Sequence, residues 1–245
     1  MKRLWLSVLL GISFSIPAVA GDNDINMSQF PSNKELFGDL IKDLGAAMSY
    51  RAVTPAEPLG MLLGIDVGLE VTGSKMKNEL NGWKTATMDN GQNTIYNGRL
   101  HVHKGLPLGI DVGAYFSSVF DSNMKSLGGE ISYAILKGST VTPALAVRGS
   151  YTAMSGVDDL DLNTAGLELS ISKGFLMLTP YAGLGAIRYE GAGIGNNNTK
   201  FDSESDTLAK YFLGVNFNMG LINFAAEADK TGENSSYSAK FGLRW

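Results

Sequence analysis

Residues 62–72 read LLGIDVGLEVT, and their apolar side chains fall on every second position. Every odd position from Leu63 to Val71 is apolar, whereas the even positions are small or polar and include Asp66 and Glu70. A period of two residues is typical of a β-strand with one apolar face and does not match the period of a helix. The stretch therefore predicts a strand whose apolar face meets an apolar environment.

The same alternation returns along the rest of the chain. With the strand that begins at residue 61, it predicts strands over 94–104, 108–120, 126–135, 141–153, 162–172, 177–190, 207–217, 221–229 and a last strand ending at Trp245. Most of these stretches are about 10–13 residues long, close to the roughly 9–11 residues that a tilted strand needs to cross a bilayer. Strands in soluble proteins average about 5–6 residues. We therefore predict an all-β fold, an antiparallel up-and-down transmembrane β-barrel of about ten strands, roughly 8–12. A soluble β-sandwich is the alternative.

The links between the predicted strands alternate in length. Short links lie at residues 104–107, 137–139, 173–174 and 218–220, and longer or more polar ones at 73–93, 121–125, 154–161, 191–206 and 230–236. Outer-membrane barrels have short periplasmic turns and longer outer loops. The pattern places the C-terminus at the periplasmic end.

The first twenty residues have the features of an export signal. Lys2 and Arg3 precede an apolar stretch, and Ala18-Val19-Ala20 is a small-residue cleavage site that predicts a mature chain beginning at Gly21. The alternative is a transmembrane anchor, for which the apolar run is too short. Residues 1–20 are thus predicted to be a signal peptide, and residues 61–245 to be the barrel.

Three segments together resemble the small outer-membrane β-barrel proteins of Gram-negative bacteria. They are Ala18-Val19-Ala20, the Thr179–Gly185 stretch TPYAGLG and the end Tyr237–Trp245, YSAKFGLRW. The resemblance covers about residues 60–245, and implies a location in the outer membrane. It also implies that Tyr237, Phe241, Leu243 and Trp245 form a signal read by the barrel-assembly machinery, with Trp245 in place of the more usual Phe.

Residues 21–60 do not follow the strand pattern and are predicted to be a helical lead-in or a plug. Ser32 and Glu35 have capping-box spacing, the apolar positions from Leu36 to Leu44 share one helical face, and Gly45 is the expected stop. Residues 46–53 are compatible with a further strand. The favoured reading is a helix packed on the periplasmic mouth, and the alternatives are a plug inside the lumen and a helix on the membrane surface.

Charged residues of both signs fall on the inward positions of the predicted strands. The acidic ones are Asp66, Glu70, Asp111, Glu130, Glu168 and Glu227, and the basic ones are Arg99, Arg148, Lys210, Lys240 and Arg244. Because unpaired charges would be costly in a narrow lumen, the near balance predicts an ion-pair network that holds the barrel shut. The functional alternative is a narrow polar pore.

An internal repeat supports the strand directions. Leu63–Gly68, LGIDVG, recurs at Leu108–Gly113, so that Asp66 and Asp111 are expected at a similar depth in the lumen. A dinucleotide site is not indicated, because the glycines lie on strands and lack the turn and helix of such sites.

The only histidines, His101 and His103, alternate onto the inward face and form a candidate polar site. A metal site there would need Asp111 as a third ligand, and we predict no metal. A lipid hydrolase would need one of these histidines with Ser117 and Asp111. We keep that as the alternative function and expect no enzyme.

Composition excludes several other classes of function. The chain has no cysteine, which removes disulfides and thiolate chemistry. Without Lys2 and Arg3 it has 18 basic and 24 acidic side chains, a net charge of −6 that argues against nucleic acid as a partner. No cofactor is predicted. The predicted function is structural, or the passage or binding of a small solute, and the predicted partners are outer-membrane lipid, the barrel-assembly machinery and that solute.

Overall fold

A computed structural model of the chain describes residues 21–60, 63–76, 82–139 and 141–245. The predicted export signal of residues 1–20 lies outside the described residues. Among the described residues, no helix combines the length and the apolar composition needed to cross a bilayer.

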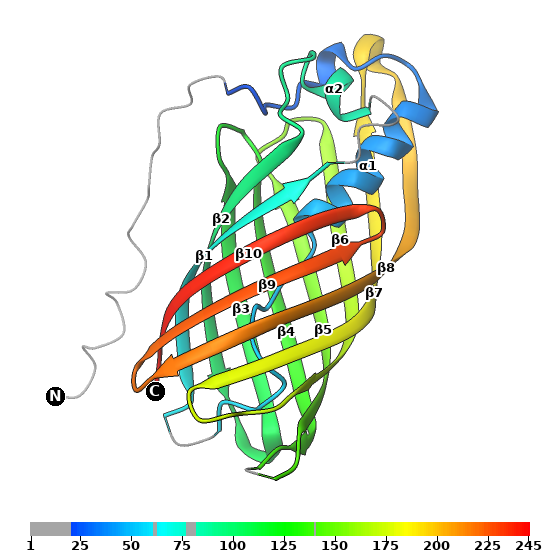
Figure 1. The fold of residues 1–245 in the computed structure, drawn as a ribbon. Helices are drawn as coiled ribbons and strands as arrows, with labels where there is room; N and C mark the ends of the chain where they lie inside the picture. The colour runs from blue at the N-terminus through cyan, green and yellow to red at the C-terminus, as the bar shows by residue number, and fades with distance from the viewer. Residues whose placement is uncertain (1–20, 61–62, 77–81, 140) are drawn as a thin grey trace, which may run out of the picture.

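In the described part of the chain, ten antiparallel strands form a closed barrel. They are β1 (Ile65–Lys75), β2 (Thr94–Gly105), β3 (Ile110–Val119), β4 (Lys125–Lys137), β5 (Ala144–Ser155), β6 (Leu160–Ser172), β7 (Leu178–Ile194), β8 (Lys200–Met219), β9 (Ile222–Thr231) and β10 (Asn234–Arg244). Each strand pairs with its neighbour in sequence, and β1 pairs with β10 from Asp66↔Arg244 to Lys75↔Ser235 to close the ring (Figure 1). The predicted fold class is confirmed.

The two faces of the barrel wall have opposite character. Along β1, Leu69 and Val71 are exposed to the outside, whereas Asp66 and Glu70 are buried in the interior. The other strands continue this exposed apolar surface, with outward side chains such as Leu100, Phe116, Leu127, Ile131, Leu167, Ile171, Leu184, Leu213, Phe224 and Phe241. An apolar band of this extent around a closed barrel is the lipid-facing surface of a transmembrane barrel.

The two copies of LGIDVG share an uncommon backbone conformation. Leu63 has φ 64° and Leu108 has φ 67°, in the left-handed region that costs a residue with a side chain about 1–3 kcal/mol. Both leucines are exposed, and both lie immediately before strands that rise from the short-turn end. The two copies of the repeat therefore have equivalent positions, where the chain enters a strand at the short-turn end of the barrel.

Two of the predicted long links are shorter than expected. In the predicted link 191–206, β7 continues to Ile194 and β8 begins at Lys200, and in the link 230–236 only residues 232 and 233 separate β9 from β10. The extended parts of β7 and β8 rise above the rest of the barrel (Figure 1). In the extension of β8, Phe201 is a buried apolar side chain, and so are Ile187 and Leu208 next to the extensions. The alternation of apolar outward and polar inward residues that marked the other strands is therefore lost there.

The long helix of the N-terminal segment, α1 (Lys34–Met48), begins and ends differently from the prediction. Asn33 is the N-cap: its side chain accepts hydrogen bonds from the backbone N–H groups of Glu35 and Leu36 at 3.0 and 3.2 Å. Ser32, the expected cap, instead bonds to Asn196 and Thr199. The helix also continues through Gly45, the expected stop, and ends at Met48. The glycine lets the helix lie close to β7, since a Cβ at that position would lie only 2.7 Å from Cβ of Tyr189.

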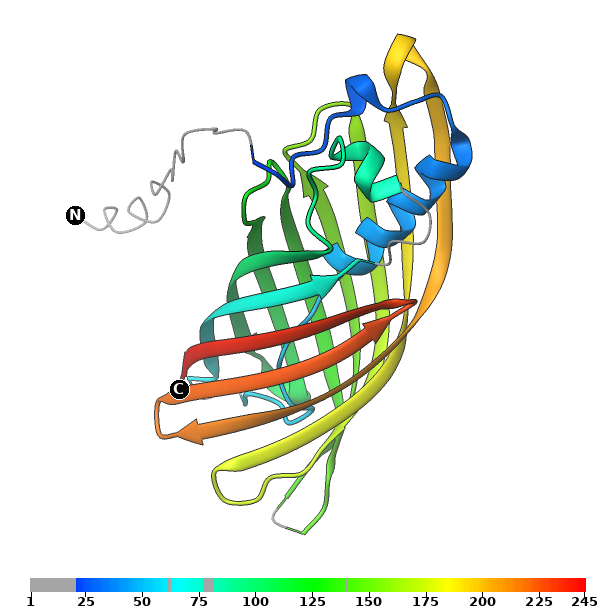
Figure 2. The same ribbon diagram turned by 45° about the horizontal axis from the view of Figure 1, so that its top comes forward.

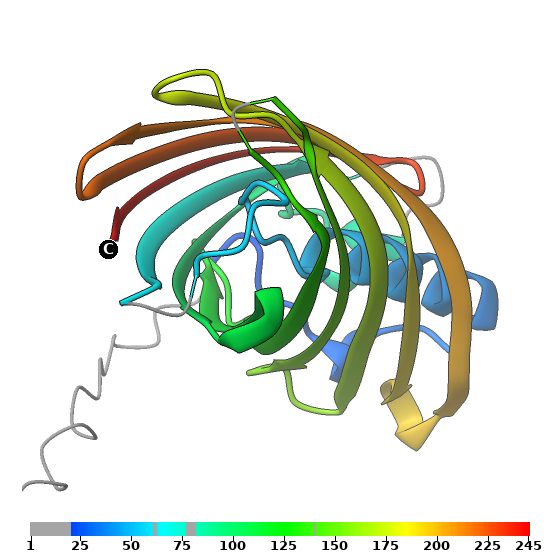
Figure 3. The ribbon, with the colours of Figure 1, turned by 90° about the horizontal axis from the view of Figure 1, so that it is seen from below.

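The N-terminal segment passes through the barrel from the long-loop end to the short-turn end (Figures 1 and 2). Asn23 donates its backbone N–H to Asp121 in the link between β3 and β4, α1 then descends inside the wall, and Gly60 lies against Gly105 at the short-turn end. Viewed along the barrel, this segment lies inside the ring of strands (Figure 3). The expected helix on the periplasmic mouth is therefore not the arrangement of this structure, and neither is the helix on the membrane surface.

Residues 49–59 inside the barrel are neither helix nor strand, so the strand considered for residues 46–53 does not form. In a closed barrel each wall strand already has two neighbours and offers no free edge. Pro55 and Pro58 also lack the N–H group that a strand ladder requires. The segment is therefore held by side chains of the wall.

A short helix, α2 (Gly82–Ala86), lies in the predicted loop 73–93. A Cβ on Gly82 would lie 2.6 Å from the backbone oxygen of Leu36, so the glycine allows α2 to approach α1 closely. Trp83 of α2 is buried in the same apolar cluster as α1. The helices α1 and α2 thus pack together at the long-loop end of the barrel.

Candidate functional site

The interior of the barrel is divided into an apolar zone and a charged zone. Near the long-loop end, α1 packs against inward apolar side chains of the wall, which include Ile95, Val119, Met154, Leu160, Leu162, Tyr189, Phe201 and Leu208. Phe37 of α1 stacks on Phe201 of β8, with ring centroids 4.3 Å apart. Toward the short-turn end, the inward side chains are charged or polar. Residues 49–59, which we call the strap, run among them.

Arg51 is the charged centre of the strap and is fully buried. Its Nε lies 2.8 Å from Oδ2 of Asp229 on β9, and its Nη2 donates to Oγ of Ser236 on β10 at 2.8 Å. Nη1 donates to the backbone oxygen of Ala47 at 2.9 Å. The guanidinium therefore joins the end of α1 to two strands of the wall.

Tyr50, next to Arg51, lies against the opposite wall. Its hydroxyl oxygen is 3.2 Å from Nε2 of His103, and its ring meets that of Tyr115 edge-on with centroids 5.1 Å apart. Tyr50 is 1% exposed, so both its hydroxyl and its ring are buried against this wall.

One set of wall charges lies on β1, β2 and β10. Asp66 pairs with Lys240 at 3.0 Å and with Nη2 of Arg244 at 2.6 Å. Glu70 pairs with Arg99 at 3.4 Å and with Nε2 of His101 at 2.5 Å.

A second set crosses β4, β5, β6 and β8. Arg148 lies between two carboxylates, 2.7 Å from Glu130 and 3.2 Å from Glu168, and Glu168 also pairs with Lys210 at 2.6 Å. Glu227 accepts a hydrogen bond from the hydroxyl of Tyr181 at 2.9 Å. These wall charges therefore form linked pairs, and isolated buried charges are largely avoided.

The wall also binds the strap backbone directly. Arg99 donates to the backbone oxygen of Ser49 at 3.3 Å, and Lys210 donates to that of Tyr50 at 2.8 Å. Lower down, the backbone N–H of Ala56 donates to Oγ of Ser172 at 3.2 Å. That of Leu59 donates to the carboxylate of Asp111 at 3.1 Å. The strap is thus bound along its whole length.

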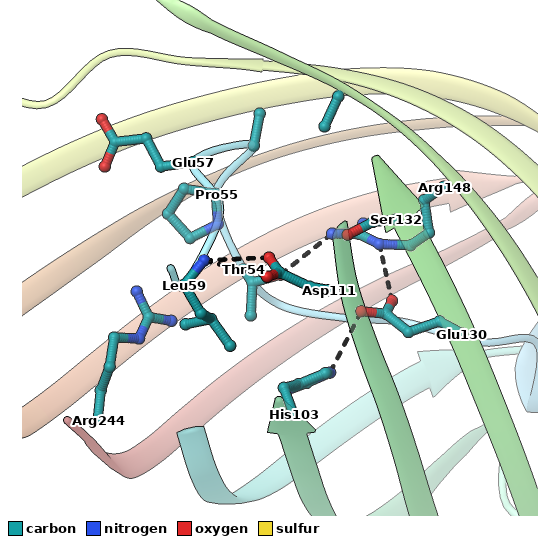
Figure 4. A pocket seen from close by; sticks show the side chains of 12 residues that line it. Thr54, Pro55, Glu57, Leu59, His103, Asp111, Glu130, Ser132, Arg148 and Arg244 are labelled. Carbon is teal, nitrogen blue, oxygen red and sulfur yellow. Dashed lines mark hydrogen bonds and ion pairs between the residues drawn. The ribbon is translucent and has the colours of Figure 1, made fainter. Parts of the chain in front are cut away.

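A small cavity of about 20 Å³ remains beside the lower strap (Figure 4). Thr54, Pro55 and Leu59 of the strap line one side, and His103, Asp111, Glu130 and Arg148 are among the wall residues. Arg148 donates to the hydroxyl of Thr54 across this space at 3.1 Å. The space has room for about one water molecule, so the strap leaves little free volume beside these wall residues.

The groups required for the hydrolase alternative have other partners. Oγ of Ser117 lies 2.6 Å from Oγ of Ser126, and His101 and His103 contact Glu70, Tyr50 and Glu130. Asp111 faces Leu59 of the strap. Among the described residues, no group of three or more His, Cys, Asp or Glu residues is arranged to hold a metal ion.

Sequence reasoning missed the residues at the centre of this site. Arg51 lies in a segment that showed no strand period, and its partner Asp229 was left out of the inward acids. The signal for Asp229 was its position two residues after Glu227, which places both on one face of β9. Arg51 had a weaker signal, a single charge in the otherwise uncharged stretch 44–56.

The C-terminal residues of the predicted assembly signal lie on the outer face of the barrel. Tyr237, Phe241, Leu243 and Trp245 all point outward and are exposed. The backbone groups of Trp245 and Ile65 exchange hydrogen bonds of 2.8 and 3.0 Å, which seals the barrel at the short-turn end. Their recognition by the assembly machinery stays a prediction.

Sequence comparisons identify no relative of this chain, because no family model and no curated protein matches it. Similar solved structures include Neisserial surface protein A, at 10% identity over 74% of this chain and 97% of that chain, with a TM-score of 0.36. The KdgM porin in complex with oligogalacturonate has 8% identity over 74% and 99% of the two chains, with a TM-score of 0.39. LpxR from Salmonella typhimurium has 9% identity over 73% and 100%, with a TM-score of 0.38. These are distant likenesses, and the fold assignment rests on the strand pairing and the apolar outer band.

Proposed function

We propose that this chain is an integral protein of the bacterial outer membrane whose narrow polar lumen is kept closed by its own N-terminal segment. A small solute would bind or pass when that segment is displaced, and the proposal assigns no catalytic role. The observation that carries it is the burial of the strap among paired charges. A barrel built only as a scaffold could fill its lumen with wall side chains, whereas this wall holds a separate segment of chain.

The charged side chains of the wall support the proposal, because they could be hydrated if the strap left the lumen. Displacing the strap would expose the carboxylates of Asp229 and Asp111 and the cations of Arg99 and Lys210, which now bind it. Such groups line aqueous pathways through barrels. The proposed partners are the surrounding lipid, which would contact the apolar outer band, the barrel-assembly machinery and the unidentified solute.

Single-channel conductance in planar bilayers tests this function. The mature chain, residues 21–245, would be compared with a deletion of residues 21–59, which removes α1 and the strap. We expect the mature chain to be silent and the deletion to conduct steadily. The matched control deletes only residues 21–32, which precede the helix, and should stay silent. A deletion of 21–59 that folds and inserts but remains silent would refute a closed conduit.

A further inference from the structure

From the contacts of the strap, we infer that the charged zone of the lumen is a binding site for an extended polypeptide. The ligand class is a segment that carries an aromatic residue followed by arginine. This inference rests on the proposed function, because a ligand can occupy the site only after the strap has left. It adds the class of molecule that the lumen recognises.

The first argument is that side chains of the wall form hydrogen bonds with the backbone of the strap. Arg99 and Lys210 donate to the consecutive carbonyl groups of Ser49 and Tyr50. Ser172 and Asp111 accept from the N–H groups of Ala56 and Leu59. Donors and acceptors are thus placed along the path of one extended chain. These contacts depend on the backbone and do not require the strap's own side chains.

The second argument is that two side chains of the strap are buried in contact with specific groups of the wall. The guanidinium of Arg51 is buried against Asp229 and Ser236. The hydroxyl of Tyr50 contacts His103, and its ring meets that of Tyr115 edge-on. A buried charge without a partner is strongly unfavourable. The place next to Asp229 therefore selects strongly for a cation, and its neighbour selects for an aromatic ring with a hydroxyl group.

The third argument is the charge of the wall itself. The inward positions of the described strands carry seven carboxylates at Asp66, Glu70, Asp111, Glu130, Glu168, Glu227 and Asp229, against five cations at Arg99, Arg148, Lys210, Lys240 and Arg244. By formal count, these side chains give the wall an excess of two negative charges, one of which Arg51 offsets. This favours a cationic peptide over anionic sugars or phosphates.

The test begins with the full mature chain, so that the barrel folds around its own segment. A protease site is inserted after Gly60, which is exposed at the short-turn end, and the folded protein is cut there in detergent. The freed segment is then removed with mild denaturant. A fluorescent peptide of residues 46–60 is titrated onto the emptied barrel, beside the same peptide carrying Arg51→Ala.

We expect the native peptide to bind saturably and the Arg51→Ala peptide to bind at least tenfold more weakly. In a barrel carrying Asp229→Asn, the difference between the two peptides should shrink to less than threefold. Equal binding of both peptides to the native barrel would overturn the inference, and so would a failure of the native peptide to bind.

A second measurement covers the case in which the emptied barrel unfolds. The cut protein is kept intact and incubated with an excess of labelled peptide spanning residues 21–60. Incorporation of the label at the rate at which the native segment leaves supports the inference, whereas loss of the native segment without incorporation overturns it. If the inference alone fails, the 21–59 deletion conducts but binds no peptide. If the proposed function fails, the deletion does not conduct even where peptide binds.

Discussion

Arg51 and Asp229 form an ion pair of 2.8 Å in the interior of the barrel, where both side chains are almost completely buried. The two residues are 178 positions apart in the chain and join the N-terminal segment to β9. Around them, Lys210 and Arg99 bind the neighbouring backbone of the strap. The segment is thus held in the barrel by specific polar contacts as well as by the apolar packing of α1, and the proposed closure of the lumen depends on both.

Asp229→Asn should destabilise the folded protein strongly, because it leaves the Arg51 guanidinium buried without its counter-charge. Losing one partner of a buried pair costs about 3–5 kcal/mol. The measurement is the urea midpoint of the refolded protein in detergent. The control is Lys34→Ala, which breaks the exposed pair between Lys34 and Glu204 and should cost about 0–1 kcal/mol. Equal effects of the two substitutions would contradict the role given to the buried pair.

Two glycines of α1 should respond in opposite ways to alanine. At Gly45 a Cβ would lie 2.7 Å from Cβ of Tyr189, so Gly45→Ala should destabilise the protein by about 1–3 kcal/mol through overpacking. At Gly38 no atom lies within 4 Å of the added Cβ, so Gly38→Ala should stabilise by about 0.5–1 kcal/mol. Denaturant midpoints of the two variants decide this. A stable Gly45→Ala variant would mean that α1 does not lie against β7.

Asn33, and not Ser32, should behave as the cap of α1. Asn33→Ala removes the acceptor of two backbone hydrogen bonds and should cost about 1 kcal/mol. Ser32→Ala removes only exposed hydroxyl contacts and should change the stability by less than about 0.5 kcal/mol. Thermal unfolding of both variants provides the comparison, and a larger loss at Ser32 would contradict the assigned cap.

The N-terminal residues should be accessible from outside an intact cell. Gly21 lies at the long-loop end, against Asp121, whereas the turn at Gly220 lies at the short-turn end, which faces the periplasm in outer-membrane barrels. An epitope inserted after Gly21 should bind antibody on whole cells, and the same epitope after Gly220 should bind it only after permeabilisation. The reverse result would mean that the segment does not cross the lumen in the cell.

The strands of the barrel wall could be predicted because the two faces of a strand are set by alternate residues of the same short stretch. The alternation at Leu69, Glu70 and Val71 depends only on lipid outside and polar groups inside, so it can be recognised from the sequence alone. It failed in the upper parts of β7 and β8, where the inward residues Tyr189, Phe201 and Leu208 are buried in the apolar cluster that contains α1. This packing against α1 is a contact between distant parts of the chain and is not visible in a local pattern.

The course of the N-terminal segment was not predictable in the same way. The helical face from Leu36 to Leu44 suits the periplasmic mouth, the lumen and a membrane surface equally well, since each offers apolar surface to one side. Its position is decided by contacts between distant residues, such as Arg51 with Asp229. The inward charges of the strands were identified, but their role in binding the strap required the structure.

The absence of cysteine from the sequence allows the central claim, closure of the lumen by the segment, to be tested on one molecule. Ala56 of the strap lies in one buried cluster with Ala144 and Ala146 of β5, so Ala56→Cys with Ala146→Cys would tether the strap by a single disulfide. Both substitutions are placed in the Asp229→Asn background, which loosens the strap. Single-channel conductance is then recorded before and after reduction. Our account predicts silence in the oxidised protein and repeated openings once the disulfide is reduced, whereas the same conductance in both states would contradict it.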